Sequence, residues 1–136
     1  MQLDSHNCVL CVENVEEDIM HLFFECPFAG ACWIYLDIHW DTSLDFQTML
    51  LRARERFDSV IFTEVVIMAM WALWTHGNSI IFYDGFLSFA WWRKTFFEGM
   101  KAVTLRVQSP LKDKILAWLS SLQLSFLFFY FGPRAL

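Results

Sequence analysis

Apolar residues recur at helical spacing over most of the chain. In one stretch they are separated by four, three and four residues, with the charged side chains mostly elsewhere: Phe46, Leu50, Ala53 and Phe57. Such a pattern predicts an amphipathic helix. Thr42 and Asp45, three residues apart just before it, resemble a capping box.

Three further segments predict helices. Residues 60–74 are apolar nearly all round, which is typical of a central helix, and Asp58-Ser59 precedes them as a cap. A helix beginning at Ser88 carries an apolar stripe, and Ser109-Pro110 starts another with the same period. The two stripes consist of Phe89, Trp92, Phe96, Met100, Val103 and Val107, and of Ile115, Trp118, Leu122, Phe126 and Phe129.

No segment shows strand alternation bounded by hairpin turns, so the predicted fold class is all-α. We expect a compact helical domain of five to seven helices with an N-terminal zinc knuckle, for reasons given below. At 136 residues the chain is long enough for one domain with a real core. We divide it into residues 1–40 with the knuckle and short helices, a helical core over 41–122 continuous with them, and an apolar tail over 123–136.

The composition predicts a partner. The chain holds 15 Phe, 7 Trp and 3 Tyr, more aromatic residues than one small core usually needs. Some should therefore remain near the surface, for a partner protein, self-association or a membrane. Trp91 and Trp92 are adjacent on one helix and cannot both face the core, so Trp91 is the expected exposed anchor. Phe128, Phe129 and Tyr130 in the tail are further candidates for partner binding.

Nucleic acid is a disfavoured partner, because the net charge is -5 and phosphate backbones are held mainly by Lys and Arg. The best basic cluster is Arg52, Arg54 and Arg56, with Trp71 and Trp74 as stacking candidates. These arginines are spread over more than one helix face and Glu55 lies among them, which favours a solvated helix surface.

The cysteines form a pattern typical of one tetrahedral zinc. Cys8, Cys11, His21 and Cys26 give the spacing C-x2-C-x9-H-x4-C. Thiolate and neutral imidazole are the ligands that zinc prefers. The alternative is that all four are reduced core residues. His6 is a weaker competing ligand, and Cys32 falls outside the set and is expected to be an ordinary buried thiol.

The stretch from Glu16 to Glu25 reads as a helix, with Glu17 one turn before His21. Glu17 can therefore orient the imidazole by accepting its second N–H, or it is a solvated surface acid. Four protein ligands leave no open position for water or substrate, so the site is structural and we expect no enzyme activity. His76 is expected to be a cap or surface residue and His39 a packed, hydrogen-bonded ring.

The run from Ile115 to Gly132 contains 18 residues without a charge. This length is the lower limit for crossing a bilayer. Membrane contact through residues 115–132, a core or interface helix, and disorder of the extreme end are the alternatives, and the core helix is favoured. No secretory pattern precedes the cysteines, so we expect a reducing intracellular compartment, nucleus or cytoplasm, with mitochondrial or membrane association left open.

These residues carry a family resemblance. The N-terminal part of the chain is similar to the zinc-binding domain downstream of reverse transcriptase in plant LINE-type (non-LTR) retroelements. The similar positions are Cys8-Val9-Leu10-Cys11, then Glu17 to Ala29 with His21, Cys26 and Pro27, and then Trp33. Trp71 to Phe82 resembles a later segment of such elements, although Gly77 stands where that pattern has Arg. The resemblance implies zinc on the four ligands. Since polymerase and nuclease parts are missing, it also implies a truncated or domesticated fragment.

The sequence therefore favours a non-enzymatic, zinc-stabilised helical protein-interaction module derived from a retroelement. An adopted element that interferes with a host pathway, as the toxin of a killer and antidote pair, is one form of it. The alternatives are an RNA- or DNA-binding remnant of a reverse transcriptase and a membrane-associated effector acting through the apolar C-terminal segment.

Overall fold

The computed structural model describes residues 9–10, 20–83 and 85–131, with side chains described up to Leu124. This part of the chain contains no strand and six helical segments, which confirms the all-α prediction. They are a π-helical turn, η1 (His21–Glu25), and the α-helices α1 (Pro27–Tyr35), α2 (Phe46–Phe57), α3 (Phe62–Phe82), α4 (Phe89–Thr104) and α5 (Ser109–Phe131).

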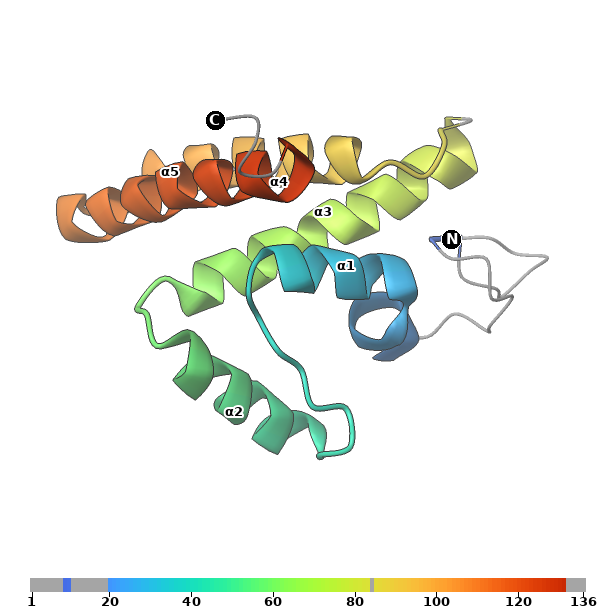
Figure 1. Cartoon of the computed structure of the whole chain (residues 1–136), viewed down its shortest axis with the longest axis horizontal. Helices are drawn as coiled ribbons and strands as arrows, with labels where there is room; N and C mark the ends of the chain where they lie inside the picture. Colours follow the sequence, from blue (N-terminus) through green and yellow to red (C-terminus); the bar gives the residue numbers. More distant parts are fainter. Residues whose placement is uncertain (1–8, 11–19, 84, 132–136) are drawn as a thin grey trace.

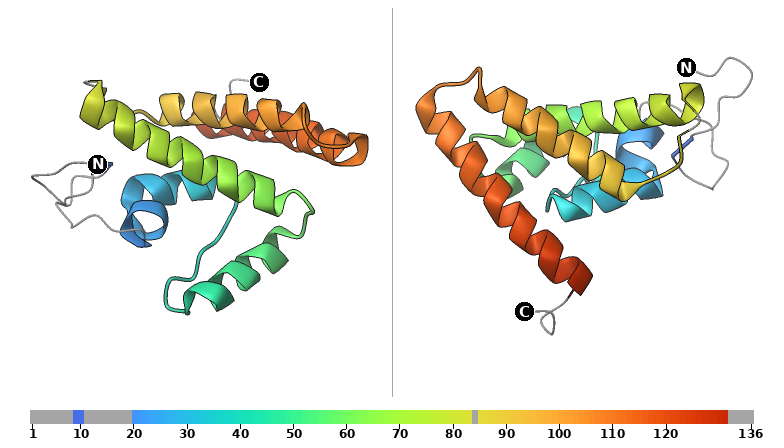
Figure 2. Two further views of the ribbon diagram at one scale, coloured as in Figure 1. Left: turned by 180° about the vertical axis from the view of Figure 1, so that it is seen from behind. Right: turned by 90° about the horizontal axis from the view of Figure 1, so that it is seen from above.

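Helix α3 crosses the middle of the molecule (Figure 1). Helix α4 packs along α3, and α5 turns back along α4. Helices α1 and α2 lie on the other side of α3, and α4 and α5 diverge from the turn that joins them (Figure 2). Tyr35 ties α1 to α5, since its hydroxyl donates to the Leu122 carbonyl oxygen at 3.4 Å.

One hydrophobic core runs from the N-terminal turn to α5. It includes Leu10, Trp33 and residues of α3, α4 and α5, among them Leu73, Phe96 and Ile115. The predicted stripe of α4 is confirmed, because Trp92, Phe96 and Met100 are fully buried. Burying side chains of this size stabilises the fold by about 1.5–3 kcal/mol each.

Helix ends follow the sequence in part. Ser88 caps α4 by accepting the Trp91 N–H at 3.1 Å, and α5 begins at Ser109-Pro110, both as predicted. The predicted capping box of α2 is wrong. Asp45 itself is the N-cap, and its carboxylate accepts the Thr48 N–H at 3.1 Å. Helix α3 begins and ends later than the predicted 60–74 segment.

Helix α3 is central, yet one side of it is uncovered. Its buried side includes Val65, Ala69 and Leu73, whereas Ile67, Trp71 and Trp74 are 55%, 48% and 43% exposed. Among the helices described, only α3 is long and apolar enough to span a membrane by length and composition. Of the uncharged run 115–132, Ile115, Leu119 and Leu122 are buried in the core, as expected for the favoured core helix.

Candidate metal centre

Two of the four predicted zinc ligands, His21 and Cys26, lie at the two ends of η1. The Cys26 N–H donates to the His21 carbonyl oxygen at 2.7 Å, a hydrogen bond five residues long that closes one wide turn. Such π-type turns occur frequently at functional sites. The turn joins the backbones of His21 and Cys26; that their side chains share a zinc stays a prediction.

This turn is fixed to α1. Pro27 follows Cys26 and starts α1, which suits a proline because the first helical N–H needs no partner. The Trp33 indole Nε1 donates to the Phe23 carbonyl oxygen at 2.6 Å. Both candidate ligands are therefore held on a short, braced segment, with His21 5% and Cys26 0% exposed.

Cys8, Cys11, Glu17 and His6 lie outside the described residues, but the two residues between the cysteines lie inside them. Leu10 is fully buried in the same core as Leu22 and Cys26. Val9 lies against α3, with its Cγ2 3.6 Å from where a β-carbon on Gly77 would stand. The middle of the Cys8–Cys11 segment is thus anchored to the body of the protein.

The surroundings of position 77 give a reason why Gly77 stands where the similar retroelement segment has Arg. Gly77 is buried in α3 and faces Val9. An Arg at this position would place a charged group in an apolar environment, which is costly without a partner.

The donor chemistry of the described pair fits zinc. A buried thiol and a buried imidazole are protected from competing water, and both belong to the ligand types of structural zinc sites. The described residues hold no group of three or more metal-ligating side chains, as expected when two of the four predicted ligands lie outside them.

Cys32 is fully buried, which confirms the prediction of a buried thiol. Burial, and to a lesser extent the neighbouring Cys26, raises the pKa of the Cys32 thiol far above its usual range. A thiol that stays protonated is a poor metal ligand and a poor nucleophile.

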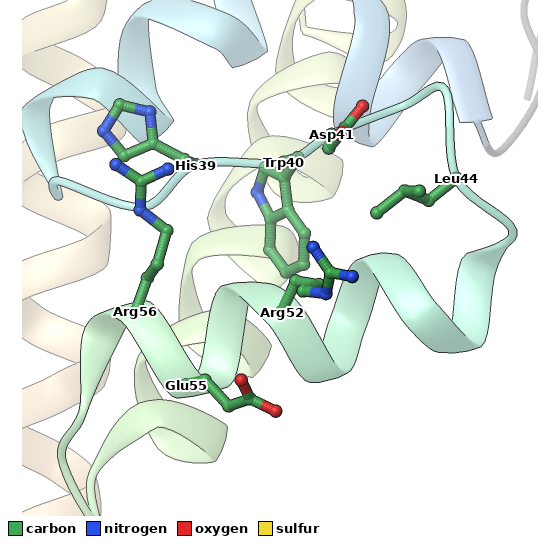
Figure 3. A pocket seen from close by; sticks show the side chains of 7 residues that line it. All are labelled: His39, Trp40, Asp41, Leu44, Arg52, Glu55 and Arg56. Atoms are coloured by element: carbon green, nitrogen blue, oxygen red, sulfur yellow. The ribbon is translucent and has the colours of Figure 1, made fainter.

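The predicted basic cluster is divided by the fold. Arg52 and Arg56 line a pocket between α2 and the loop before it, and Arg54 does not (Figure 3). All three are exposed. The pocket itself was not predicted from the sequence, because its other wall comes from the loop residues His39, Trp40, Asp41 and Leu44.

The prediction for His39 is wrong, and so is the surface alternative for His76, although His76 does accept the N–H of Ser88, the N-cap residue of α4. His39 is exposed on that loop, 3.7 Å from the Asp37 carboxylate, and is not a packed ring. His76 is buried at 1% exposure and is not a surface residue. Its ring stacks on Trp91, with the centroids 4.8 Å apart.

The aromatic candidates for partner binding are placed as follows. Trp92 points into the core and Trp91 is half-buried, with one ring face occupied by His76. The side chains of Phe128, Phe129 and Tyr130 lie outside the described part of the chain. The most exposed tryptophans in the structure are instead Trp71 and Trp74 on α3.

Residues 1–33 match the protein family described as zinc-binding in reverse transcriptase. No curated protein and no solved structure matches the chain. The matched segment contains all four predicted ligands, so the comparison supports a retroelement-type zinc-binding segment at this end of the chain.

Proposed function

We propose that this chain is a non-enzymatic, zinc-stabilised helical module that binds a protein partner. The observation that carries the zinc part is the packing of Leu10, from between Cys8 and Cys11, in the same core as Cys26. In this proposal Cys8, Cys11, His21 and Cys26 hold one zinc, which pins the N-terminal segment to α1 and α3.

The metal would act structurally. Zinc with four protein ligands has no free position for a reacting water. The surrounding residues bury the ligands and exclude solvent, and Trp33 holds the turn in place. Zinc binding to a small structural site contributes roughly 10 kcal/mol or more to folding.

A matched pair of variants tests the metal site. Cys26 and Cys32 are both fully buried, so Cys26→Ser and Cys32→Ser cause similar changes in packing. Metal analysis of the purified full chain should find about one zinc in the wild type and in Cys32→Ser, and much less in Cys26→Ser. Equal zinc content in the two variants, or none in the wild type, would refute the zinc site.

The interaction part of the proposal rests on the α3 face, which we define as Ile67, Trp71 and Trp74. These residues are spaced four and three apart and lie on one side of the helix. Three large apolar side chains that are about half exposed on one helix face are typical of an interaction surface.

A shallow groove borders the α3 face. It is lined by Met68 and Trp71 of α3 and by Gly99, Ala102 and Val103 of α4, with Arg106 beyond them. The groove has a volume of about 270 Å³. Its mostly apolar lining suits the side chains of an apolar partner helix, and Arg106 favours an acidic residue at that end. The partner we propose is therefore a protein with an amphipathic helix.

Paired substitutions test this surface. Partners captured from cells by crosslinking would be purified and titrated against the full chain. Trp71→Ser/Trp74→Ser should weaken binding by about tenfold or more, because exposed aromatic anchors dominate such interfaces. Leu51→Ser/Val60→Ser, which changes two exposed apolar residues outside the α3 face, should not. Equal effects of the two double variants would contradict the assignment.

Membrane association is the alternative function that one observation favours, the length and apolar composition of α3. Flotation of the protein with lipid vesicles that is lost in Trp71→Ser/Trp74→Ser would replace the protein partner by a lipid surface. Flotation lost on deletion of residues 123–136 would instead assign contact to the tail. A toxin acting on a host protein is one form of the protein-binding proposal.

A further inference from the structure

A pocket of about 620 Å³ lies between α2 and the loop that leads into it. The loop contributes His39, Trp40, Asp41 and Leu44, and α2 contributes Arg52, Glu55 and Arg56 (Figure 3). None of these residues belongs to the predicted metal site. The volume is in the range of small-molecule pockets, about 300–1,000 Å³.

The pocket is lined by two guanidinium groups. Arg52 and Arg56 are one helical turn apart; Arg56 extends to His39 of the loop, and Arg52 lies beside the Trp40 ring (Figure 3). Within the described part of the chain, the one ion pair joins His39 to Asp37, so neither arginine pairs with a carboxylate there.

The two acidic residues of the lining are directed elsewhere. The Asp41 carboxylate accepts hydrogen bonds from the Ser43 N–H at 3.1 Å and the Ser43 hydroxyl at 2.5 Å. These bonds, with a smaller effect of Arg52, hold the pKa of Asp41 below its usual value. The Glu55 carboxylate points away from the loop in the close view (Figure 3). Neither carboxylate of the lining therefore forms an ion pair with Arg52 or Arg56, although Asp41 is near enough to Arg52 to be influenced by its charge.

Trp40 forms a fixed wall of the pocket. Its ring packs edge-on against Phe24 and Trp33, with centroids 5.0 and 5.2 Å away, so the indole is fixed in place. Its Nε1 is buried and has no hydrogen-bond partner in the described structure. Buried donors without an acceptor are rare and often mark the place of a bound ion or water.

We propose that this pocket binds a small molecule through a phosphate monoester group. The phosphate would lie between Arg52 and Arg56, beside the Trp40 indole. A monoester carries close to two negative charges and three free oxygens, which suits two guanidinium forks better than a carboxylate does. The remaining volume, beside Trp40 and Leu44, takes an apolar or aromatic body.

The test is an NMR titration of the full chain with three probes at constant ionic strength. The probes are inorganic phosphate, phenyl phosphate and benzoate. The indole N–H signal of Trp40, assigned by its loss in Trp40→Phe, should shift saturably with both phosphates. Phenyl phosphate should bind more tightly than inorganic phosphate, and benzoate should cause little change.

Matched variants locate the binding. Arg52→Gln/Arg56→Gln should weaken phenyl phosphate binding by about tenfold or more, because two charge-assisted bonds are lost. Arg54→Gln removes a charge from the same helix outside the pocket and should leave the affinity unchanged. All these substitutions are on exposed side chains, and the dispersion of the spectra verifies folding.

Three results would overturn the proposal. They are no saturable shift of the Trp40 signal with either phosphate, an effect of Arg54→Gln as large as that of the double variant, and benzoate binding as tightly as phenyl phosphate. Single-stranded RNA that binds through all three arginines equally would assign the basic side of α2 to nucleic acid instead. Zinc content is measured separately, so these outcomes are distinguishable from failure of the metal site.

Discussion

His76 accepts the backbone N–H of Ser88 through its Nε2, at 3.0 Å. Ser88 is the N-cap of α4, so this bond joins α3 to the start of the next helix. Since Nε2 accepts, the ring proton is on Nδ1, which lies 3.4 Å from the Ser79 hydroxyl oxygen. That hydroxyl in turn donates to the His76 carbonyl oxygen at 2.7 Å. Neutral His76 therefore organises the connection between α3 and α4.

The stability of the protein should fall as the pH falls below about 6.5, the ordinary pKa of histidine. Burial lowers the pKa of His76 below that value. Between the two pKa values the unfolded chain binds more protons than the folded one, so the free energy of unfolding decreases with falling pH. Protonation of Nε2 also uses the lone pair that accepts the Ser88 N–H, so this hydrogen bond is lost. Urea denaturation between pH 8 and pH 5 measures the effect.

His76→Gln is the control for this pH dependence, because its side-chain oxygen accepts an N–H without titrating. The variant should show a flatter profile over the same range. The pKa values of the Asp41 and Asp45 carboxyls are lowered from the ordinary value of 3.8. Protonation of these two groups therefore reduces the free energy of unfolding only at more acidic pH, below 3.8. An identical slope in wild type and His76→Gln would show that another group is responsible.

Trp92→Phe should destabilise the protein more than Trp91→Phe. Trp92 is fully buried, stacks on Phe96 with centroids 5.4 Å apart, and donates from Nε1 to the Ala69 carbonyl oxygen at 3.3 Å. The smaller ring leaves a cavity and removes this hydrogen bond, at a cost of about 2 kcal/mol. Trp91 is half-buried, so its replacement should cost less than about 1 kcal/mol. Chemical denaturation of both variants checks the order.

The helices were predictable because their signal is local. In α4 the residues Trp92, Phe96 and Met100 recur at helical spacing, and that period alone selects the face that becomes buried. His21 and Cys26 lie at the two ends of one turn for a similarly local reason, their spacing of five residues, and their sharing of a zinc stays a prediction.

Features that depend on which elements cover one another were not predictable. Helix α3 is apolar nearly all round, so its sequence does not indicate that Trp71 and Trp74 stay exposed. The burial of His76 depends on Trp91 and Ser88, which come from the next helix. The pocket at Arg52 and Arg56 depends likewise on how the preceding loop returns to α2.

Asp45→Ala should lower the melting temperature, whereas Thr42→Ala should leave it nearly unchanged. The Asp45 carboxylate accepts both the N–H and the hydroxyl of Thr48, at 3.1 and 2.7 Å. Loss of an N-cap leaves a helix N–H without its acceptor. Thermal unfolding followed by circular dichroism compares the two variants. A larger decrease in melting temperature for Thr42→Ala than for Asp45→Ala would support the capping box expected from the sequence instead.

Gly30→Ala and Gly99→Ala should have opposite effects on stability. Both glycines lie within helices, where alanine is favoured by about 0.5–1 kcal/mol. A β-carbon on Gly30 meets nothing within 4 Å, so this variant should gain that amount. A β-carbon on Gly99 would stand 2.7 Å from the Met68 sulfur, where α4 approaches α3. Met68 or the helix must then move, which should give a net loss of about 1 kcal/mol. Urea denaturation of both variants measures the difference, and a gain in Gly99→Ala equal to that in Gly30→Ala would show that the two helices are not closely packed at this point.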